Sequence, residues 1–131
     1  MTGIDPNRAW KKTSKAVTPT IHNIKKQILN SKSQNALILD LHSHSTKLGC
    51  FFYGNYGSGN LKEYRKLPSR VCQNDIRFNY KNCRFRGGSE SSARKALFNE
   101  LNLPNIFTVE CSLMGYIQGN RINEYKITDY Y

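Results

Sequence analysis

Two histidines and one aspartate at alternate positions are the first residues in this sequence that could do chemistry. Asp40, His42 and His44 come directly after the apolar run of residues 36–39, which predicts a strand buried on both faces. Alternate side chains of a strand point to the same side, and imidazole is the commonest metal ligand. The spacing therefore permits a metal site at the end of this strand. The alternative is a turn in which the histidines cap backbone groups.

A carboxylate within a second apolar run is the next candidate. Residues 106–109 are β-branched or aromatic, and Glu110 follows them, so the pattern predicts a buried strand that carries one acid. A buried carboxylate must be paired, metal-bound or functional to offset its desolvation, and such acids act as bases in many enzymes. The alternative is a glutamate at the strand end that points into water or pairs with a lysine or arginine.

Two basic segments could bind anions. Asn7 and Arg8 place a neutral donor beside a planar guanidinium, which suits bidentate capture of a carboxylate or phosphate, although an ordinary basic tail has the same composition. A second segment alternates basic and aromatic residues, as a surface for single-stranded nucleic acid does, but a strand with one wet face explains it equally, and no RNA-recognition, KH or zinc-finger signature is present. Its members are Arg77, Phe78, Tyr80, Lys81, Arg84, Phe85 and Arg86.

The chain upstream of the Asp40 segment predicts a helix that feeds the first strand. Thr18 suits the N-cap and Pro19 the first helical position. A helix that leads into a buried strand favours an α/β fold. The expected apolar face comprises Ile21, Ile24, Ile28 and Leu29, and the expected solvent-facing lysines are Lys25, Lys26 and Lys32.

A second helix is predicted before the Glu110 strand. Ser89 can cap a helix that starts at Glu90, and Pro104 prevents its continuation. Between the two strands, residues 61–70 predict an exposed loop or short helix, and residues 76–85 predict a twisted strand or hairpin. The expected apolar face of the second helix comprises Ala93, Ala96, Leu97 and Leu101.

The size and charge of the chain narrow the class of partner. Its 131 residues suffice for a single domain, and 20 basic against 9 acidic side chains give a net charge of +11, which implies an anionic partner. The absence of an apolar span and of a targeting segment predicts a cytosolic protein. Buried, reduced thiols are expected at the four cysteines, Cys50, Cys72, Cys83 and Cys111, which lack metal-binding spacing.

Several short segments occur in the same order in a known family. They are GIDPNRAW at residues 3–10, TPTI at 18–21, LDLHSHS at 39–45, SESSAR at 89–94 and FTVEC at 107–111. These resemble the segments G-x-D-L-N-R-x-W, H-P-T-I, D-L-H-G-H-S, K-E-G-T-A-R and Y-T-L-E-A of the cytosolic zinc metallocarboxypeptidases, the branch that includes tubulin deglutamylases. The resemblance covers nearly the whole chain.

The resemblance implies a role for each candidate residue. His42 would be a zinc ligand, Glu110 the general base and acid, and Asn7 with Arg8 the clamp on the terminal carboxylate of the substrate. Arg94 lies near the position that sets side-chain specificity in these enzymes, and a cation there would select a C-terminal glutamate. The implied function is zinc-dependent removal of C-terminal residues from acidic protein tails such as those of tubulin, in the cytoplasm and without a membrane partner.

One motif of the family is absent from the sequence. The two further zinc ligands come from an upstream H-x-x-E, whereas Lys25, Ser45 and Lys47 occupy the third position after the three histidines. Residues 1–131 therefore resemble the C-terminal portion of a single truncated catalytic domain, with a partial mixed β-sheet flanked by helices. Two alternatives remain: a module that binds acidic tails through Asn7, Arg8 and Arg94 without catalysis, and a nucleic-acid-binding domain that uses residues 77–86.

Overall fold

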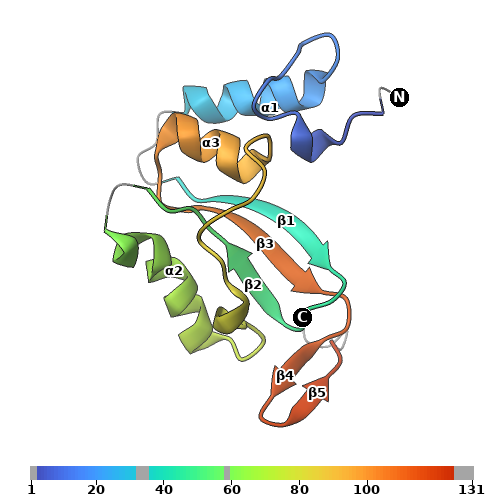
Figure 1. Ribbon diagram of the computed structural model, residues 1–131, viewed down its shortest axis with the longest axis vertical. Helices are drawn as coiled ribbons and strands as arrows, with labels where there is room; N and C mark the ends of the chain where they lie inside the picture. Colours follow the sequence, from blue (N-terminus) through green and yellow to red (C-terminus); the bar gives the residue numbers. More distant parts are fainter. Residues whose placement is uncertain (1–2, 32–35, 58–59, 126–131) are drawn as a thin grey trace.

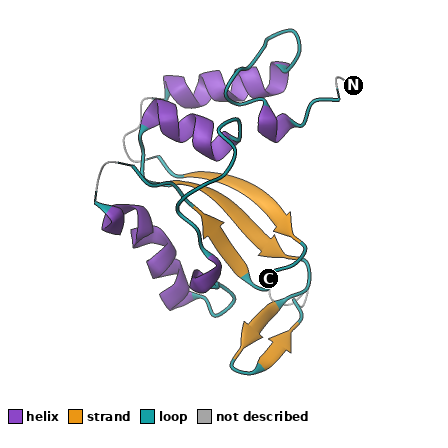
Figure 2. Cartoon of the chain, viewed as in Figure 1, coloured by secondary structure: helices purple, strands orange, loops and turns teal. Residues whose placement is uncertain are grey.

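A three-stranded mixed sheet forms the centre of the protein (Figures 1 and 2). The computed structural model describes residues 3–31, 36–57 and 60–125. Strands β1 (Ile38–His44), β2 (Cys50–Tyr53) and β3 (Ile106–Ser112) are arranged in the order β1-β3-β2, with β3 parallel to β1 and antiparallel to β2. This arrangement confirms the predicted α/β class with a partial mixed sheet.

Three helices surround this sheet. Helices α1 (Pro19–Asn30) and α3 (Ala93–Leu101) lie side by side on one side of the sheet, and α2 (Leu61–Asn74) lies on the other (Figure 1). Two short 3₁₀ helices, η1 (Pro6–Arg8) and η2 (Tyr80–Asn82), and a hairpin of β4 (Tyr116–Gln118) and β5 (Arg121–Asn123) complete the described elements. No helix in the described part of the chain has the length and apolar character needed to cross a bilayer.

The apolar core consists of two clusters that hold the helices on the sheet. One cluster joins Leu97 and Phe98 of α3 to Ile106 of β3, with Ile28 of α1 packed at its edge. The other gathers the aromatic side chains of β2, β3 and the segment after α2, with Leu67 and Val71 of α2 against them. Its buried members are Phe51, Phe52, Phe78, Cys83, Phe85 and Phe107.

The prediction that β1 is buried on both faces is wrong. Its side chains alternate between half-buried and exposed, and Leu39 and Leu41 are 44% and 74% exposed. The strand lies at the edge of the described sheet, and α2 packs over β2 and β3 instead. The apolar run of residues 36–39 has the composition of a strand that is covered on both faces, but among the described residues only one face of β1 is covered.

The boundaries of two other predicted elements also differ. Helix α3 begins three residues later than expected, because Ser92 rather than Ser89 is its N-cap and accepts a hydrogen bond from the Lys95 amide. Residues 76–85 form no regular strand or hairpin. They contact β2 through two isolated bridges, Cys50 with Phe78 and Tyr53 with Arg84, and η2 interrupts the pairing between them.

Residues 61–70, predicted as an exposed loop or a short helix, belong to the longer helix α2. Asn60 caps α2 by accepting from the Lys62 amide, and the buried side chains of Tyr64 and Pro68 stand four residues apart on its inner face. A spacing of four residues is that of one helix face, so the sequence is compatible with a helix whose inner face carries Tyr64 and Pro68 and whose charged residues point to solvent. The charged side chains are therefore the outer surface of a packed helix.

The prediction of buried, reduced thiols is only partly correct, because the four cysteines differ in burial. All four cysteines are free thiols, and Cys83 is buried, but Cys72 is exposed on α2. Burial raises the pKa of the Cys50 and Cys83 thiols to about 11. Since the thiolate is the reactive form, these two cysteines are poor nucleophiles at neutral pH.

Lys25 of α1 is not the solvent-facing residue that the periodicity predicts. Its side chain is buried, and its ammonium group donates to the carbonyl of Trp10 at 2.7 Å and pairs with Glu100 of α3. This bond ties α1 to the N-terminal segment and to α3. Lys26 is exposed as expected, and Lys32 lies outside the described residues.

The structure predicts unequal effects of removing the two neighbouring lysines. Lys25→Ala leaves the Trp10 carbonyl and Glu100 without their donor, so we expect it to lower the free energy of unfolding by about 1–3 kcal/mol. Lys26→Ala, the control, is expected to change it by less than about 0.5 kcal/mol. Urea denaturation followed by circular dichroism measures both, and equal effects would contradict a structural role for Lys25.

Candidate active site

The parallel pairing of β1 and β3 brings the two strongest catalytic candidates together. His42 is the direct partner of Glu110 in the register, and Asp40 is the partner of Thr108. Paired residues in adjacent strands project to the same face of a sheet. His42, Glu110 and Asp40 therefore share one face near the carboxyl ends of the two strands, where open α/β sheets bind their ligands.

Asp40 orients the imidazole of His42. The His42 Nε2 atom lies 2.9 Å from Asp40 Oδ1, and both side chains are partly exposed. No described group lies within hydrogen-bonding distance of His42 Nδ1. A histidine held through one ring nitrogen by a carboxylate presents the other nitrogen to a metal or substrate.

Asn7 connects three elements at this site. Its side-chain nitrogen lies 3.2 Å from Asp40 Oδ2 and 3.1 Å from His42 Nε2, and its side-chain oxygen accepts a hydrogen bond of 2.8 Å from the Ala93 amide. Asp5 caps η1 by accepting from the Asn7 amide. Both ends of the Asn7 carboxamide are therefore used inside the protein, which makes Asn7 a positioning residue in this structure.

Arg8 remains available to a ligand. One of its guanidinium nitrogens donates to the Asn7 carbonyl at 2.8 Å, and the side chain is exposed. Within the described part of the chain, no carboxylate pairs with it. The structure thus separates the predicted clamp into an internal amide at Asn7 and an open cation at Arg8.

His44 has the capping role that was the alternative for both histidines. Its Nδ1 atom accepts from the amides of Thr46 and Lys47 at 3.2 and 3.1 Å, and its ring meets Phe51 edge-on at 5.1 Å. It is therefore committed to the turn after β1. The two histidines of the same alternating pattern have different roles in the fold.

Arg94 is buried rather than open to solvent. Its guanidinium group donates to the Gly54 carbonyl, to Asn55 Oδ1 and to the Gly87 carbonyl. Burial lowers its pKa, while the nearby charge of Asp40 acts in the opposite direction. Arg94 is thus close to the site, but these internal bonds occupy it, and its role in substrate recognition stays a prediction.

Two further residues near this face, Lys47 and Asn55, carry no signal in the sequence that points to the site. The Lys47 ammonium group lies 5.2 and 5.4 Å from the ring centroids of Phe51 and Tyr53. Phe51 is the β2 partner of Glu110, so a cation lies near the face that carries Glu110. Asn55 is almost fully buried and holds Arg94 while donating to the Ile106 carbonyl. Neither residue has a recognisable spacing relative to its partners. Asn55 contacts residues that are distant in sequence, and Lys47 reaches its two rings across the irregular turn between β1 and β2.

Comparisons with known proteins find relatives for nearly the whole chain. It is 30% identical to cytosolic carboxypeptidase 1 of Danio rerio, over 91% of this chain and 12% of that protein. It is 31% identical to cytosolic carboxypeptidase 6 of Homo sapiens, over 88% and 25%, and 32% identical to a putative zinc carboxypeptidase of Plasmodium falciparum, over 86% and 8%. The chain is a homologue of the cytosolic carboxypeptidases. It spans a quarter or less of the length of these three relatives.

The fold of this carboxypeptidase homologue agrees with its sequence relationships. A metallo-carboxypeptidase from Burkholderia cenocepacia superposes with a TM-score of 0.74 at 14% identity, over 95% of this chain and 34% of that structure. No protein-family model matches the chain. The individual relatives therefore confirm the expected family, and the superposition confirms the expected fold.

The described residues of the homologue do not fit a complete zinc site. A catalytic zinc ion needs three protein ligands and one open position. His42 has the free nitrogen and the orienting carboxylate of one ligand, but no group of three histidine, cysteine, aspartate or glutamate side chains converges within the described ranges. Further ligands would have to come from outside these residues.

The divided clamp predicts different consequences at two adjacent positions. Asn7→Ala removes the acceptor for the Ala93 amide and the donor to Asp40, so we expect a loss of about 1–2 kcal/mol in the free energy of unfolding. Arg8→Ala, the matched control, is expected to change it by less than about 0.5 kcal/mol. Thermal denaturation distinguishes the two variants, and a loss at Arg8 as large as at Asn7 would contradict this division.

The incomplete ligand set predicts weak metal binding by the isolated chain. After dialysis against zinc-free buffer, the purified chain should retain far less than one zinc ion per molecule, because a single imidazole does not hold the ion. Atomic emission spectroscopy measures the ratio. Retention of one equivalent, and its loss in His42→Ala, would show that the chain contains a complete site.

Proposed function

We propose that this chain is the part of a cytosolic metallocarboxypeptidase that supplies the catalytic glutamate and one zinc ligand. The proposal rests above all on one observation, the register of His42 with Glu110 on parallel strands. The reaction would be hydrolysis of the last peptide bond of a protein tail, in the cytoplasm. The names of the relatives support the class of reaction and the compartment.

The residues divide the work of such a hydrolysis. Glu110 would take a proton from the attacking water and pass it to the leaving amine. His42 would bind zinc, oriented by Asp40, and zinc would polarise the scissile carbonyl. Arg8 would bind the terminal carboxylate through its free guanidinium edge, and Asn7 would hold the loop that carries Arg8 against β1 and α3.

Glutamate-rich tails, such as those of tubulin, are the proposed substrates. The net charge of +11 would attract an acidic tail and speed its encounter with the site. Arg94 would contribute positive potential near Asp40 and, where an incoming carboxylate displaces one of its carbonyl partners, a direct contact. The substrate class therefore rests on charge, whereas the class of reaction rests on the register of the strands.

A non-catalytic module for acidic tails is the second candidate function. It is favoured by the lack of three converging metal ligands among the described residues. Nucleic-acid binding through residues 77–86 is less well supported, because Phe78 and Phe85 are buried in the core and cannot stack on bases.

A completed enzyme tests the leading proposal. We expect that joining an upstream segment that bears H-x-x-E ahead of Gly3 creates a zinc-dependent carboxypeptidase. In this protein Glu110→Gln should retain zinc and substrate binding but reduce the rate of glutamate release by about 10²–10⁴-fold, because the amide cannot accept the proton. His42→Ala should lose the metal.

Glu124→Gln is the matched control, since it changes an exposed carboxylate outside the site. Release of glutamate from a C-terminal glutamate peptide is measured by chromatography. If the Glu110→Gln enzyme were as fast as the parent, Glu110 would not be the base and the assignment of β3 would be wrong.

A further inference from the structure

A second anion-binding feature lies outside the candidate active site, between α2 and the segment that follows η2. Three arginines, Arg65, Arg84 and Arg86, line a cavity of about 340 Å³ together with Tyr56, Leu61 and Phe85. None of the described residues that line this cavity is acidic. We call this cavity the arginine pocket.

The three guanidinium groups of the arginine pocket are held in place by the fold. Arg65 lies over the ring of Phe85 at 5.2 Å, and Arg86 lies over the ring of Tyr56 at 5.0 Å. Arg84 donates to the carbonyls of Lys81 and Cys83 at 3.0 and 2.9 Å. A guanidinium group that is stacked or tethered in this way loses less entropy when it binds a carboxylate.

None of these charges is neutralised within the described part of the chain. The ion pairs there use Lys25, His42, Arg77 and Lys95, and none uses an arginine of the pocket. Three like charges close together repel one another and raise the local potential. An arrangement of this kind favours a ligand that brings several negative charges.

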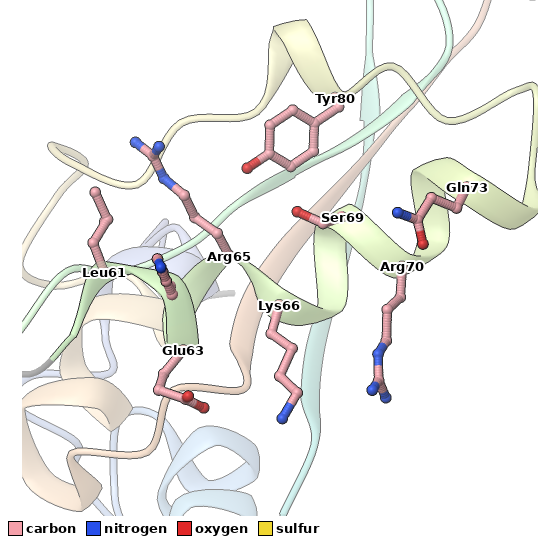
Figure 3. Close-up of a pocket in the computed structure, with 9 residues that line it drawn as sticks. Leu61, Glu63, Arg65, Lys66, Ser69, Arg70, Gln73 and Tyr80 are labelled. Atoms are coloured by element: carbon pink, nitrogen blue, oxygen red, sulfur yellow. The ribbon is translucent and has the colours of Figure 1, made fainter.

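The arginine pocket continues along α2 into a longer basic groove. A neighbouring cavity of about 570 Å³ shares Leu61 and Arg65 with it and is lined by one acid, Glu63. Arg65 and Ser69 lie on the side of α2 that faces Tyr80, while Lys66 and Arg70 extend from the other side (Figure 3). All four cations of α2 line this cavity and span about two helical turns, so an extended segment that crosses the helix could contact cations from both sides. They are Lys62, Arg65, Lys66 and Arg70.

We propose that the arginine pocket and the adjoining groove on α2 bind the acidic stem of a glutamate-rich polypeptide, away from the site that would cleave its end. Arginine forks bind carboxylates in a bidentate manner. We choose a protein tail over nucleic acid because the Phe85 ring is buried and Arg86 occupies one face of the partly exposed Tyr56 ring, which leaves little aromatic surface on which bases could stack. The choice of glutamate as the bound residue rests on the proposed function, whereas the inference that this surface binds an anion rests on the three arginines alone.

The arginine pocket and the candidate active site lie on different faces of the sheet. Phe85 packs in the cluster that holds Phe107 and the α2 residues Leu67 and Val71, and side chains of a strand alternate between faces, so Phe107 and Glu110 point to opposite sides of β3. The groove would therefore hold the stem of the tail and raise its local concentration at the site. A single carboxylate cannot occupy both.

Binding of a labelled peptide of about ten glutamates tests the proposal on the full 131-residue chain. The peptide carries a C-terminal amide, so that its affinity does not depend on a carboxylate clamp at Arg8. In fluorescence anisotropy at about 0.15 M salt, the triple variant Arg65→Gln, Arg84→Gln, Arg86→Gln should lower the affinity about tenfold or more. The matched control is Lys12→Gln, Lys15→Gln, Lys26→Gln, which removes three exposed cations elsewhere and should lower it less than about threefold.

A second variant excludes loss of structure as the cause. Replacement of the same three arginines by lysine keeps the charge but removes the stacked forks, so it should recover only part of the affinity that the glutamine triple loses, and both triples should keep the circular dichroism spectrum of the parent. Equal losses of affinity in the test and control triples would overturn the proposal. It would also be overturned if the parent chain bound a single-stranded oligothymidylate of equal charge more tightly than the peptide and the test triple abolished that binding. Since no hydrolysis is measured, these outcomes are independent of the activity test of Glu110.

Discussion

The parallel pairing of β1 with β3 is the constraint on which the candidate site depends. It sets His42 beside Glu110 and Asp40 beside Thr108 without any contribution from the loops. A shift of one residue in this register would move His42 or Glu110 to the opposite face of the sheet. The chemistry therefore depends on the same hydrogen bonds that hold the sheet together, and the core residue Ile106, opposite Ile38, anchors the register at its beginning.

Asn7 extends this constraint to a segment that has few apolar contacts of its own. Residues 3–8 are mostly exposed, and the carboxamide of Asn7 joins them to β1 on one side and to the first amide of α3 on the other. The first amides of a helix have no partner within the helix, so this bond also completes the start of α3. The loop that carries Arg8 is thus placed by polar contacts, in contrast to the strands.

The sequence predicts elements well where local chemistry decides them and less well where neighbours decide them. The start of α1 at Pro19 and the strand at Ile106 are both found. Proline at the first helical position and a run of β-branched and aromatic residues are enough to specify them, although the Thr18 hydroxyl bonds to Ser14 and does not cap α1. The exposure of Leu41, the burial of Lys25 and the bonds of Arg94 depend on which distant element packs against each side chain. The same applies to the site: its candidate residues are visible in the sequence, but the division between a bound Asn7 and an open Arg8 is not.

The positive charge of the protein has three distinct roles that composition alone cannot separate. Lys25 and Arg94 are buried and bind carbonyl groups, so they stabilise the fold. Arg8 is exposed and follows Asn7, the residue that contacts His42 and Asp40. The remaining exposed cations include Arg65 of α2, Arg84 and Arg86, whose side-chain motion is limited by ring stacking or by bonds to backbone carbonyls. Because fixed charges bind a multivalent anion with less loss of entropy than mobile ones, the proposed anionic partner would be bound mainly by these placed arginines. The number of lysines and arginines overstates the charge available to a partner, since Lys25 and Arg94 are buried.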